Sequence, residues 1–208
     1  MALKAIGLNA TLKGSKGGES SSTDKMVGLV RDALGKHEVE WVGTIRLADH
    51  DIKPGVSSDE GNGDAWPELR KQILDADILV FGTPIWMGQL PSVAKRVLER
   101  MDAFLSETDD KGRMPSTGKV VAVAIVGNED GAHKVSADLF QGLGDTGWTV
   151  PPGGPAYWVG EAMGKVDFKD LPKVPDKVTQ TVEMLASNAH HLASLLADKP
   201  FPGVEPEA

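Results

Sequence analysis

Segments with the apolar pattern of a strand alternate with segments of helical pattern along the whole 208-residue chain. Five such rounds follow one another, and no repeat of about 20 to 50 residues divides them. An alternation of this kind is typical of a parallel sheet with helices on both of its faces. We therefore predict an α/β fold with five parallel strands, built as one domain over residues 1–200 and followed by a Pro-containing tail at 201–208.

The expected strands differ in how apolar they are, which indicates where each lies in the sheet. Residues 77–82 and 119–126 are almost wholly apolar, as central parallel strands are. Residues 39–47 alternate between apolar and polar side chains, which favours a position near an edge of the sheet. The other two expected strands are residues 3–8 and a short strand that begins at 148–150.

Between the strands, apolar residues recur at intervals of three or four, the spacing of an amphipathic helix. The expected helices cover residues 26–34, 67–76, 91–104, 135–144 and 176–196. A G-x-G-x-x-G motif at residues 142–147 follows a helix and precedes a strand. Because a dinucleotide-binding fingerprint needs the reverse order, we interpret this motif as the end of the fourth helix.

Composition excludes several classes of function. The formal net charge of −8 argues against sequence-independent binding of nucleic acid or of an anionic membrane surface. The chain has no cysteine, so disulfides, thiolate catalysis and protein-bound iron–sulfur clusters are excluded, and redox chemistry would need a cofactor. Residues 1–10 lack the apolar core of a signal peptide, and the longest apolar stretch, residues 120–126, is far shorter than a membrane span. We expect a cytoplasmic protein whose partner is a small molecule.

The loop after the first strand, residues 10–23, is rich in hydroxyls and glycines and leads into a helix. A helix start offers unpaired N–H groups and a partial positive charge, so such a loop can bind an anion. The candidate residues are Thr11, Lys13, Ser21, Ser22 and Thr23, with Lys13 as the formal positive charge. The alternative is a polar surface loop in which Ser22 or Thr23 merely caps the helix.

Two further loops follow the carboxyl ends of central strands, where ligands bind in open α/β sheets. Residues 82–91 include Trp86 and Met87, which can pack on a flat apolar ring; alternatively, Trp86 covers the end of the core or a subunit contact. Residues 127–133 place two glycines around polar residues, so their N–H groups can face a developing negative charge. His133 either acts on a substrate or is solvated, and we expect no metal site.

Three stretches carry a resemblance to a known family. They are Ala10-Thr11-Leu12-Lys13 with Ser21-Ser22-Thr23, the segment A-D-x-x-x-x-G-T-P-x-W at residues 76–86, and the P-x-x-x-K helix start at residues 91–95. With them the chain resembles the flavodoxin-like NAD(P)H-dependent FMN reductases and related quinone reductases over nearly its whole length. The resemblance implies a doubly wound sheet of strand order 2-1-3-4-5. Thr and Lys stand where that family has Ser and Arg at the phosphate loop.

The resemblance also implies where FMN binds. The first-loop candidates lie around its phosphate, and Tyr157 or Trp158 walls one side of its ring. Along the isoalloxazine ring and at its pyrimidine edge lie Thr83, Pro84, Ile85, Trp86, Met87 and Gly88, and then Gly127, Asn128, Glu129, Asp130 and Gly131. No side chain is assigned a catalytic role, because the cofactor performs the chemistry.

The function that the resemblance implies is an FMN-binding oxidoreductase. Hydride passes from NAD(P)H to FMN and then to a quinone, free flavin or similar small acceptor, in a homodimer or homotetramer. A flavodoxin-type electron carrier without its own NAD(P)H turnover is the alternative. A phosphoacceptor signalling domain is disfavoured, because Asn9-Ala10 stands where paired carboxylates are needed. A structural or interaction domain that binds no cofactor stays open.

Overall fold

The computed structural model describes residues 2–162 and 164–204, so 205–208 of the expected tail lie outside the described residues. Five parallel strands form one sheet in the order β2-β1-β3-β4-β5, which confirms the predicted fold and strand order. The strands are β1 (Lys4–Asn9), β2 (Glu40–Arg46), β3 (Ile78–Pro84), β4 (Val120–Gly127) and β5 (Ala156–Val159).

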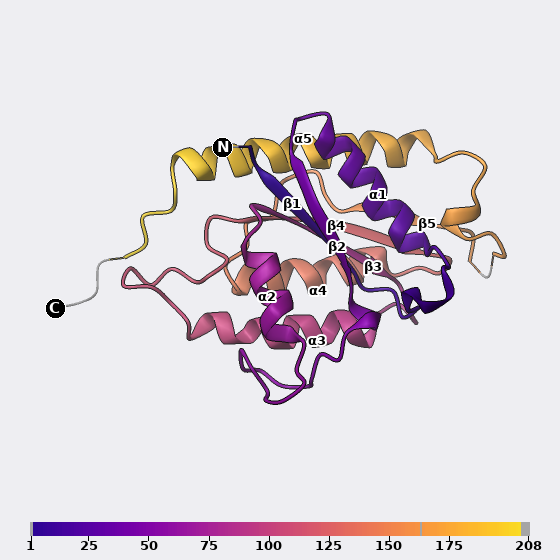
Figure 1. Cartoon of the computed structure of the whole chain (residues 1–208). Coiled ribbons are helices and arrows are strands. Elements are labelled where there is room, and N and C mark those ends of the chain that lie inside the picture. The colour runs from indigo at the N-terminus through magenta and orange to yellow at the C-terminus, as the bar shows by residue number, and fades with distance from the viewer. Residues whose placement is uncertain (1, 163, 205–208) are drawn as a thin grey trace.

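Helices cover both faces of the sheet (Figure 1). On one face lie α1 (Ser22–Gly35) and α5 (Asp176–Asp198), whose buried residues share one core cluster. On the other face lie α2 (Trp66–Leu74), α3 (Ser92–Met101) and α4 (Ala132–Asp145), which share a second cluster. The end of α4 at Asp145 confirms that the glycine motif terminates a helix rather than binding a dinucleotide.

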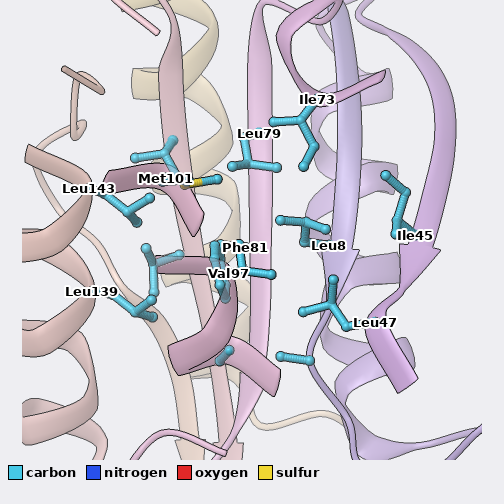
Figure 2. Close-up of a cluster of buried hydrophobic side chains, with 14 of the residues drawn as sticks. Leu8, Ile45, Leu47, Ile73, Leu79, Phe81, Val97, Met101, Leu139 and Leu143 are labelled. Atoms are coloured by element: carbon cyan, nitrogen blue, oxygen red, sulfur yellow. The ribbon is translucent and has the colours of Figure 1, made fainter. Parts of the chain in front are cut away.

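The core explains the apolar pattern of the strands. Because alternate side chains of a strand point to opposite faces, Leu79 and Phe81 of β3 pack toward α3 and α4, while Ile78 and Val80 pack toward α1 and α5. Figure 2 shows the first of these clusters, with Leu8 and Phe81 beside Val97 of α3. The edge strand β2 has exposed and half-buried residues in alternation, as its sequence predicts.

The predicted start of the fifth strand is wrong. We expected a strand that begins at residues 148–150, but β5 spans Ala156–Val159. Thr149 forms only an isolated bridge with Val120 at the start of β4. Pro151 and Pro152 follow and lack the N–H groups that a sheet ladder needs, so pairing resumes only where Ala156 lies beside Ala124.

A glycine of β3 lets α1 lie close to the carboxyl edge of the sheet. A Cβ placed on Gly82 would be 2.2 Å from Cγ2 of Val27 and 3.1 Å from Cγ2 of Thr23. Any larger residue would therefore push the first turn of α1 away from β3. The close approach brings the start of α1 next to the loop that follows β3.

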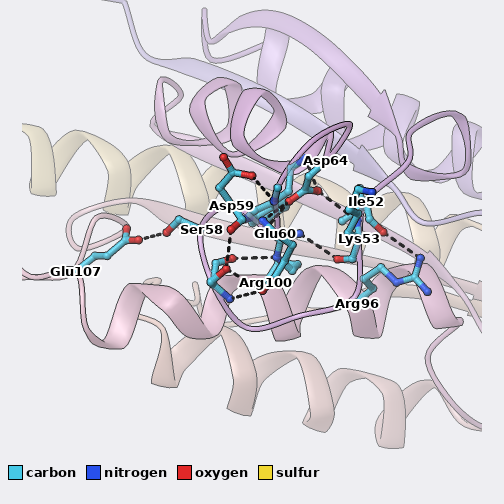
Figure 3. Close-up of polar contacts among 12 residues, drawn as sticks. Ile52, Lys53, Ser58, Asp59, Glu60, Asp64, Arg96, Arg100 and Glu107 are labelled. Atoms are coloured by element: carbon cyan, nitrogen blue, oxygen red, sulfur yellow. Dashed lines mark hydrogen bonds and ion pairs between the residues drawn. The ribbon is translucent and has the colours of Figure 1, made fainter.

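The long polar stretch between β2 and α2 is held against α3 by buried arginine (Figure 3). The guanidinium of Arg100 donates from Nε to Ser57 O (2.9 Å) and from Nη1 to Lys53 O (3.0 Å). It also forms an ion pair with Asp64 at 2.8 Å, and both side chains are fully buried. Arg96 adds a hydrogen bond from Nη1 to Ile52 O (3.0 Å). These contacts satisfy loop carbonyls that have no partners in a helix or sheet.

Candidate functional site

A cavity of about 490 Å³ lies where the carboxyl ends of β1, β3 and β4 meet. Three segments that are far apart in the sequence converge on it: residues 11–23, 84–87 and 126–129. The lining residues that the sequence analysis named are Thr11, Lys13, Ser21, Ser22, Thr23, Pro84, Ile85, Trp86, Met87, Gly127, Asn128 and Glu129. This position is the crevice in which open α/β sheets bind ligands.

At the start of α1, the cap is made by Ser21. Its Oγ accepts a hydrogen bond from the backbone N–H of Asp24 (3.1 Å), and the carboxylate of Asp24 accepts one from Ser21 N–H (2.7 Å). This capping box satisfies the helix start, so the alternative that Ser22 or Thr23 caps the helix is wrong. The hydroxyls of Ser22 and Thr23 are therefore not needed as helix caps.

Thr23 carries an unsatisfied polar group at the cavity. Its side chain is 1% exposed, and Oγ1 has no hydrogen-bond partner among the residues that the structure describes. A buried hydroxyl without a partner costs about 1–3 kcal/mol, so such groups are rare unless a ligand or water completes them. Ser22 Oγ accepts a hydrogen bond from Lys169 N–H (3.2 Å), which leaves its own hydrogen available for donation.

The first loop is held by residues that the sequence analysis did not single out. Arg46, the last residue of β2, contacts Asp24 at 2.5 Å and donates to the carbonyl oxygens of Lys13 (3.2 Å) and Glu19 (3.5 Å). Asn9 Nδ2 donates to the other carboxylate oxygen of Asp24. The alternating pattern of β2 places Arg46 on a polar face, but nothing in the sequence indicates that this face meets the loop.

A second carboxylate also anchors this loop. Asp49 Oδ1 accepts a hydrogen bond from the backbone N–H of Ser15 (2.7 Å). This hydrogen bond, which favours the charged form, lowers the pKa of Asp49 below its ordinary value. The end of β2 and the residues after it therefore contact the loop at three points: Lys13, Ser15 and Glu19.

The wall opposite α1 is a tight turn that carries an exposed aromatic residue. Trp86 and Gln89 exchange backbone hydrogen bonds, and Met87 between them has a positive φ of 50°. Met87 N–H donates to Glu129 Oε1 at 2.5 Å, which joins the second loop to the third. Trp86 is 50% exposed, so its indole does not cover the end of the core.

Four of the predicted residues are not among those that line the cavity: Thr83, Gly88, Asp130 and Gly131. Thr83 is fully buried in β3. Gly131 has a φ of 126°, and a Cβ on it would be 2.7 Å from the Cα of Gly88. Only glycine permits this backbone contact, so Gly131 lets the third loop lie against the second loop at Gly88.

The wall formed by β5 contains Trp158, whereas Tyr157 lies outside the cavity. Neighbouring residues of a strand point to opposite faces, and Tyr157 packs edge-on against His133 of α4, with ring centroids 5.6 Å apart. His133 also lies outside the cavity lining. Asp167 does line it and accepts a hydrogen bond from Asn128 Nδ2 (2.7 Å), although no pattern in the loop after β5 predicted this.

The arrangement fits FMN. At one end are the start of α1, the unpartnered Thr23 hydroxyl and the cation Lys13, which suit a phosphate ester. The same lining contains the indoles of Trp86 and Trp158, which suit a flat ring. In the described ranges, no group of three or more His, Asp or Glu side chains is placed to hold a metal ion.

The fold and the cavity define an α/β protein of the flavodoxin-like class. A family model described as NADPH-dependent FMN reductase matches residues 4–163. The chain belongs to this family, whose cofactors are FMN and NAD(P)H, and it is an FMN-binding oxidoreductase.

Two relatives are similar over nearly the whole chain. The 8-demethyl-8-aminoriboflavin-5′-phosphate synthase of Streptomyces davaonensis is 34% identical, with 97% of this chain and 81% of the synthase covered. The crystal structure of RosB with bound 8-demethyl-8-formylriboflavin-5′-phosphate superimposes with a TM-score of 0.84 at 31% identity. That match covers 96% of this chain and 82% of the RosB chain.

A third relative is the divalent metal cation transporter MntH of Mycobacterium bovis, which is 35% identical over 93% of this chain. The chain spans only 29% of that transporter's length. Among the described residues, every helix is too short or too polar to cross a bilayer.

Proposed function

We propose that this oxidoreductase takes hydride from NAD(P)H onto FMN and passes it to a small acceptor such as a quinone or free flavin. The observation that carries the proposal is one cavity that joins the unpartnered hydroxyl of Thr23 to the indoles of Trp86 and Trp158. Donors that suit a phosphate and indoles that suit a flat ring, in one cavity of about 490 Å³, match the two chemically different parts of FMN.

In this proposal, each wall of the cavity has a separate task. Ser22, Thr23 and Lys13 hold the phosphate together with the N–H groups at the start of α1. Trp86 and Trp158 bind the ring and exclude water from it. The backbone around Gly127 and Asn128 faces the polar edge of the ring, where fixed N–H groups stabilise negative charge.

FMN, when bound, supplies the ring that accepts and donates hydride. The chain therefore needs no nucleophile or general base of its own, and its contribution is binding, orientation and the exclusion of water. Because the net charge of −8 repels a phosphate dianion at long range, affinity has to come from these local donors and from burial of the ring.

The phosphate assignment is tested with the double variant Ser22→Ala/Thr23→Ala. We expect the affinity for FMN, measured by quenching of flavin fluorescence, to fall at least about tenfold, because two hydrogen bonds to a charged group are lost. The matched control is Thr179→Ala/Ser187→Ala, which removes the same two hydroxyls from exposed positions of α5. Unchanged FMN affinity in Ser22→Ala/Thr23→Ala would contradict the assignment.

The reductase activity is tested by mixing the FMN-loaded protein with NADPH or NADH and following flavin absorbance. Rapid bleaching, followed by reoxidation when a quinone or free flavin is added, supports the proposal. If neither nucleotide bleaches the flavin at a useful rate, the electron-carrier alternative holds instead.

The similarity to the aminoriboflavin-phosphate synthase favours a second candidate, in which a flavin phosphate is the substrate rather than the resident cofactor. The same cavity would then bind a riboflavin 5′-phosphate whose ring is modified. Mass spectrometry of the flavin recovered after incubation separates the two candidates. A changed ring mass supports the second, and FMN recovered unchanged after many rounds of NAD(P)H oxidation supports the first.

The proposal also includes the setting of the enzyme: one FMN-binding domain over residues 1–200, a cytoplasmic location, and assembly as a homodimer or homotetramer. Light scattering coupled to size-exclusion chromatography measures the assembly directly. A mass equal to that of one 22.1 kDa chain, with and without FMN, would contradict an oligomer.

A further inference from the structure

We propose that Arg46 is a positioning residue that makes the site selective for the phosphate ester of a flavin over the unphosphorylated flavin. This inference rests on the proposed function, because it concerns the same cavity. Arg46 does not line that cavity, so its effect is transmitted through the first loop rather than by direct contact with a ligand.

The guanidinium of Arg46 joins both ends of the first loop to the helix that follows it. The side chain is 15% exposed and contacts Asp24, on the first turn of α1, at 2.5 Å. Nη1 donates to Lys13 O (3.2 Å) and to Glu19 O (3.5 Å). The residues between these two carbonyls, 14–18, are all exposed and include only a short 3-10 turn, so they have little packing of their own.

The two bonded carbonyls lie beside residues that line the phosphate end of the cavity. Lys13 lines it directly, and Glu19 is two residues before Ser21. Ordering such a loop costs conformational entropy, which a ligand must otherwise offset when it binds. Arg46 holds the loop at Lys13 and Glu19 before the ligand arrives. Less conformational entropy is therefore lost when the phosphate binds.

Arg46 also neutralises the carboxylate of Asp24, which lies close to the expected position of the phosphate. Asp24 is in the first turn of α1, next to the hydroxyls of Ser22 and Thr23, and its carboxylate would repel a phosphate dianion. Arg46 is the cation that contacts this carboxylate among the described residues, and Asn9 adds a neutral hydrogen bond. A lysine would restore the charge but not the planar set of donors that reaches three acceptors.

The experiment measures the affinities of Arg46→Ala and Arg46→Lys for FMN and for riboflavin, which lacks the phosphate. We expect Arg46→Ala to bind FMN at least about tenfold more weakly, because the loop must then be ordered on binding and the carboxylate of Asp24 repels the phosphate without its cation. Riboflavin should bind within about twofold of wild type. Arg46→Lys should recover only part of the FMN affinity. The control is Arg31→Ala on α1, whose pair with Asp32 is exposed; the ratio of the two affinities should not change.

An unchanged ratio of FMN to riboflavin affinity in Arg46→Ala overturns the inference, whether both affinities stay the same or fall together. Full recovery of FMN affinity by Arg46→Lys overturns the claim that a planar guanidinium is needed to contact Asp24, Lys13 and Glu19 together. If circular dichroism shows that Arg46→Ala does not fold, Arg46→Gln carries the same test, because it keeps part of the aliphatic stem and a polar end but removes the charged guanidinium. A wild-type protein that binds neither flavin contradicts the proposed function itself, which keeps the two failures distinguishable.

Discussion

Two arginine–aspartate pairs each hold a long loop of this protein, and they differ in burial. Arg100 and Asp64 lie 2.8 Å apart with both side chains fully buried (Figure 3), and they fix the loop between β2 and α2. Arg46 and Asp24 lie 2.5 Å apart with side chains 15% and 26% exposed, and they fix the loop between β1 and α1. In both pairs the guanidinium also donates to loop carbonyls.

From this difference in burial we expect an arginine–aspartate pair to serve stability in one loop and ligand binding in the other. A buried charge whose partner is removed cannot return to water, so the loss is large. A partly exposed charge is rehydrated, so the loss of stability is small. We therefore expect the Arg100 pair to determine whether the protein stays folded, and the Arg46 pair to determine how well the folded protein binds a phosphate ester.

The largest effect is expected for Arg100→Ala. It leaves the buried carboxylate of Asp64 without its cation and two loop carbonyls without this donor, so the free energy of unfolding should fall by about 3–5 kcal/mol. Urea unfolding followed by circular dichroism measures this loss. In Arg31→Ala, whose pair with Asp32 is exposed, the loss should stay within about 0.5 kcal/mol. Similar losses in Arg100→Ala and Arg31→Ala would contradict the stabilising role of the buried Arg100 pair.

The contribution of Asp64 should depend on pH. Burial alone would raise the pKa of Asp64, but the guanidinium of Arg100 and the N–H groups of Glu60, Trp66 and Lys53 outweigh it and hold the pKa far below its ordinary value of 3.8. The unfolded chain therefore binds a proton at higher pH than the folded protein does. The resulting stability is present above about pH 4 and is lost as the pH falls toward the folded pKa.

Asp64→Asn tests this dependence. At pH 7 the variant should be about 3 kcal/mol less stable than wild type, because Arg100 is left buried without its anion. The gap should narrow as the pH is lowered below about 4, since only the wild type loses stability from protonation of this group. A gap that stays constant between pH 7 and pH 3, measured by urea unfolding at each pH, would contradict the role of the charged carboxylate.

Of the changes to the two pairs, Arg46→Ala is expected to have the smallest effect on stability. Because its pair with Asp24 is partly exposed and the capping box of Ser21 remains, the free energy of unfolding should fall by no more than about 1 kcal/mol. The same variant is expected to lose FMN affinity, so stability and binding are affected to different degrees. A loss as large as that of Arg100→Ala would mean that both pairs serve mainly the fold.

Much of the architecture could be predicted from residue patterns. The apolar runs of β3 and β4 and the alternation in β2 indicated their places in the sheet. A strand buried on both faces is apolar throughout, whereas a strand buried on one face alternates between apolar and polar residues. The fifth strand was misplaced because Trp148 and Val150 are apolar for a different reason: they pack against the core cluster before two prolines interrupt the pairing.

The candidate site was predicted less completely. The hydroxyls around Ser22 and the exposed Trp86 follow strands directly, so their positions could be inferred from the order of elements. Arg46 and Asp167 come from segments without a recognisable motif, and the alternative between Tyr157 and Trp158 depended on which face of β5 each residue points to. β5 has only four residues, which is too few for an apolar alternation to show which side chains face the cavity.

The sequence by itself determined the class of fold and the loops that bear the site, because the spacing of apolar residues selects strand or helix and the topology of a parallel sheet brings its loops to one edge. Only the tertiary structure decided which side chains meet across those loops: Arg46 with Lys13 and Glu19, Arg100 with Asp64, and Trp158 with the cavity. Contacts between residues that are distant in the chain depend on distances set by packing, and no local pattern encodes those distances.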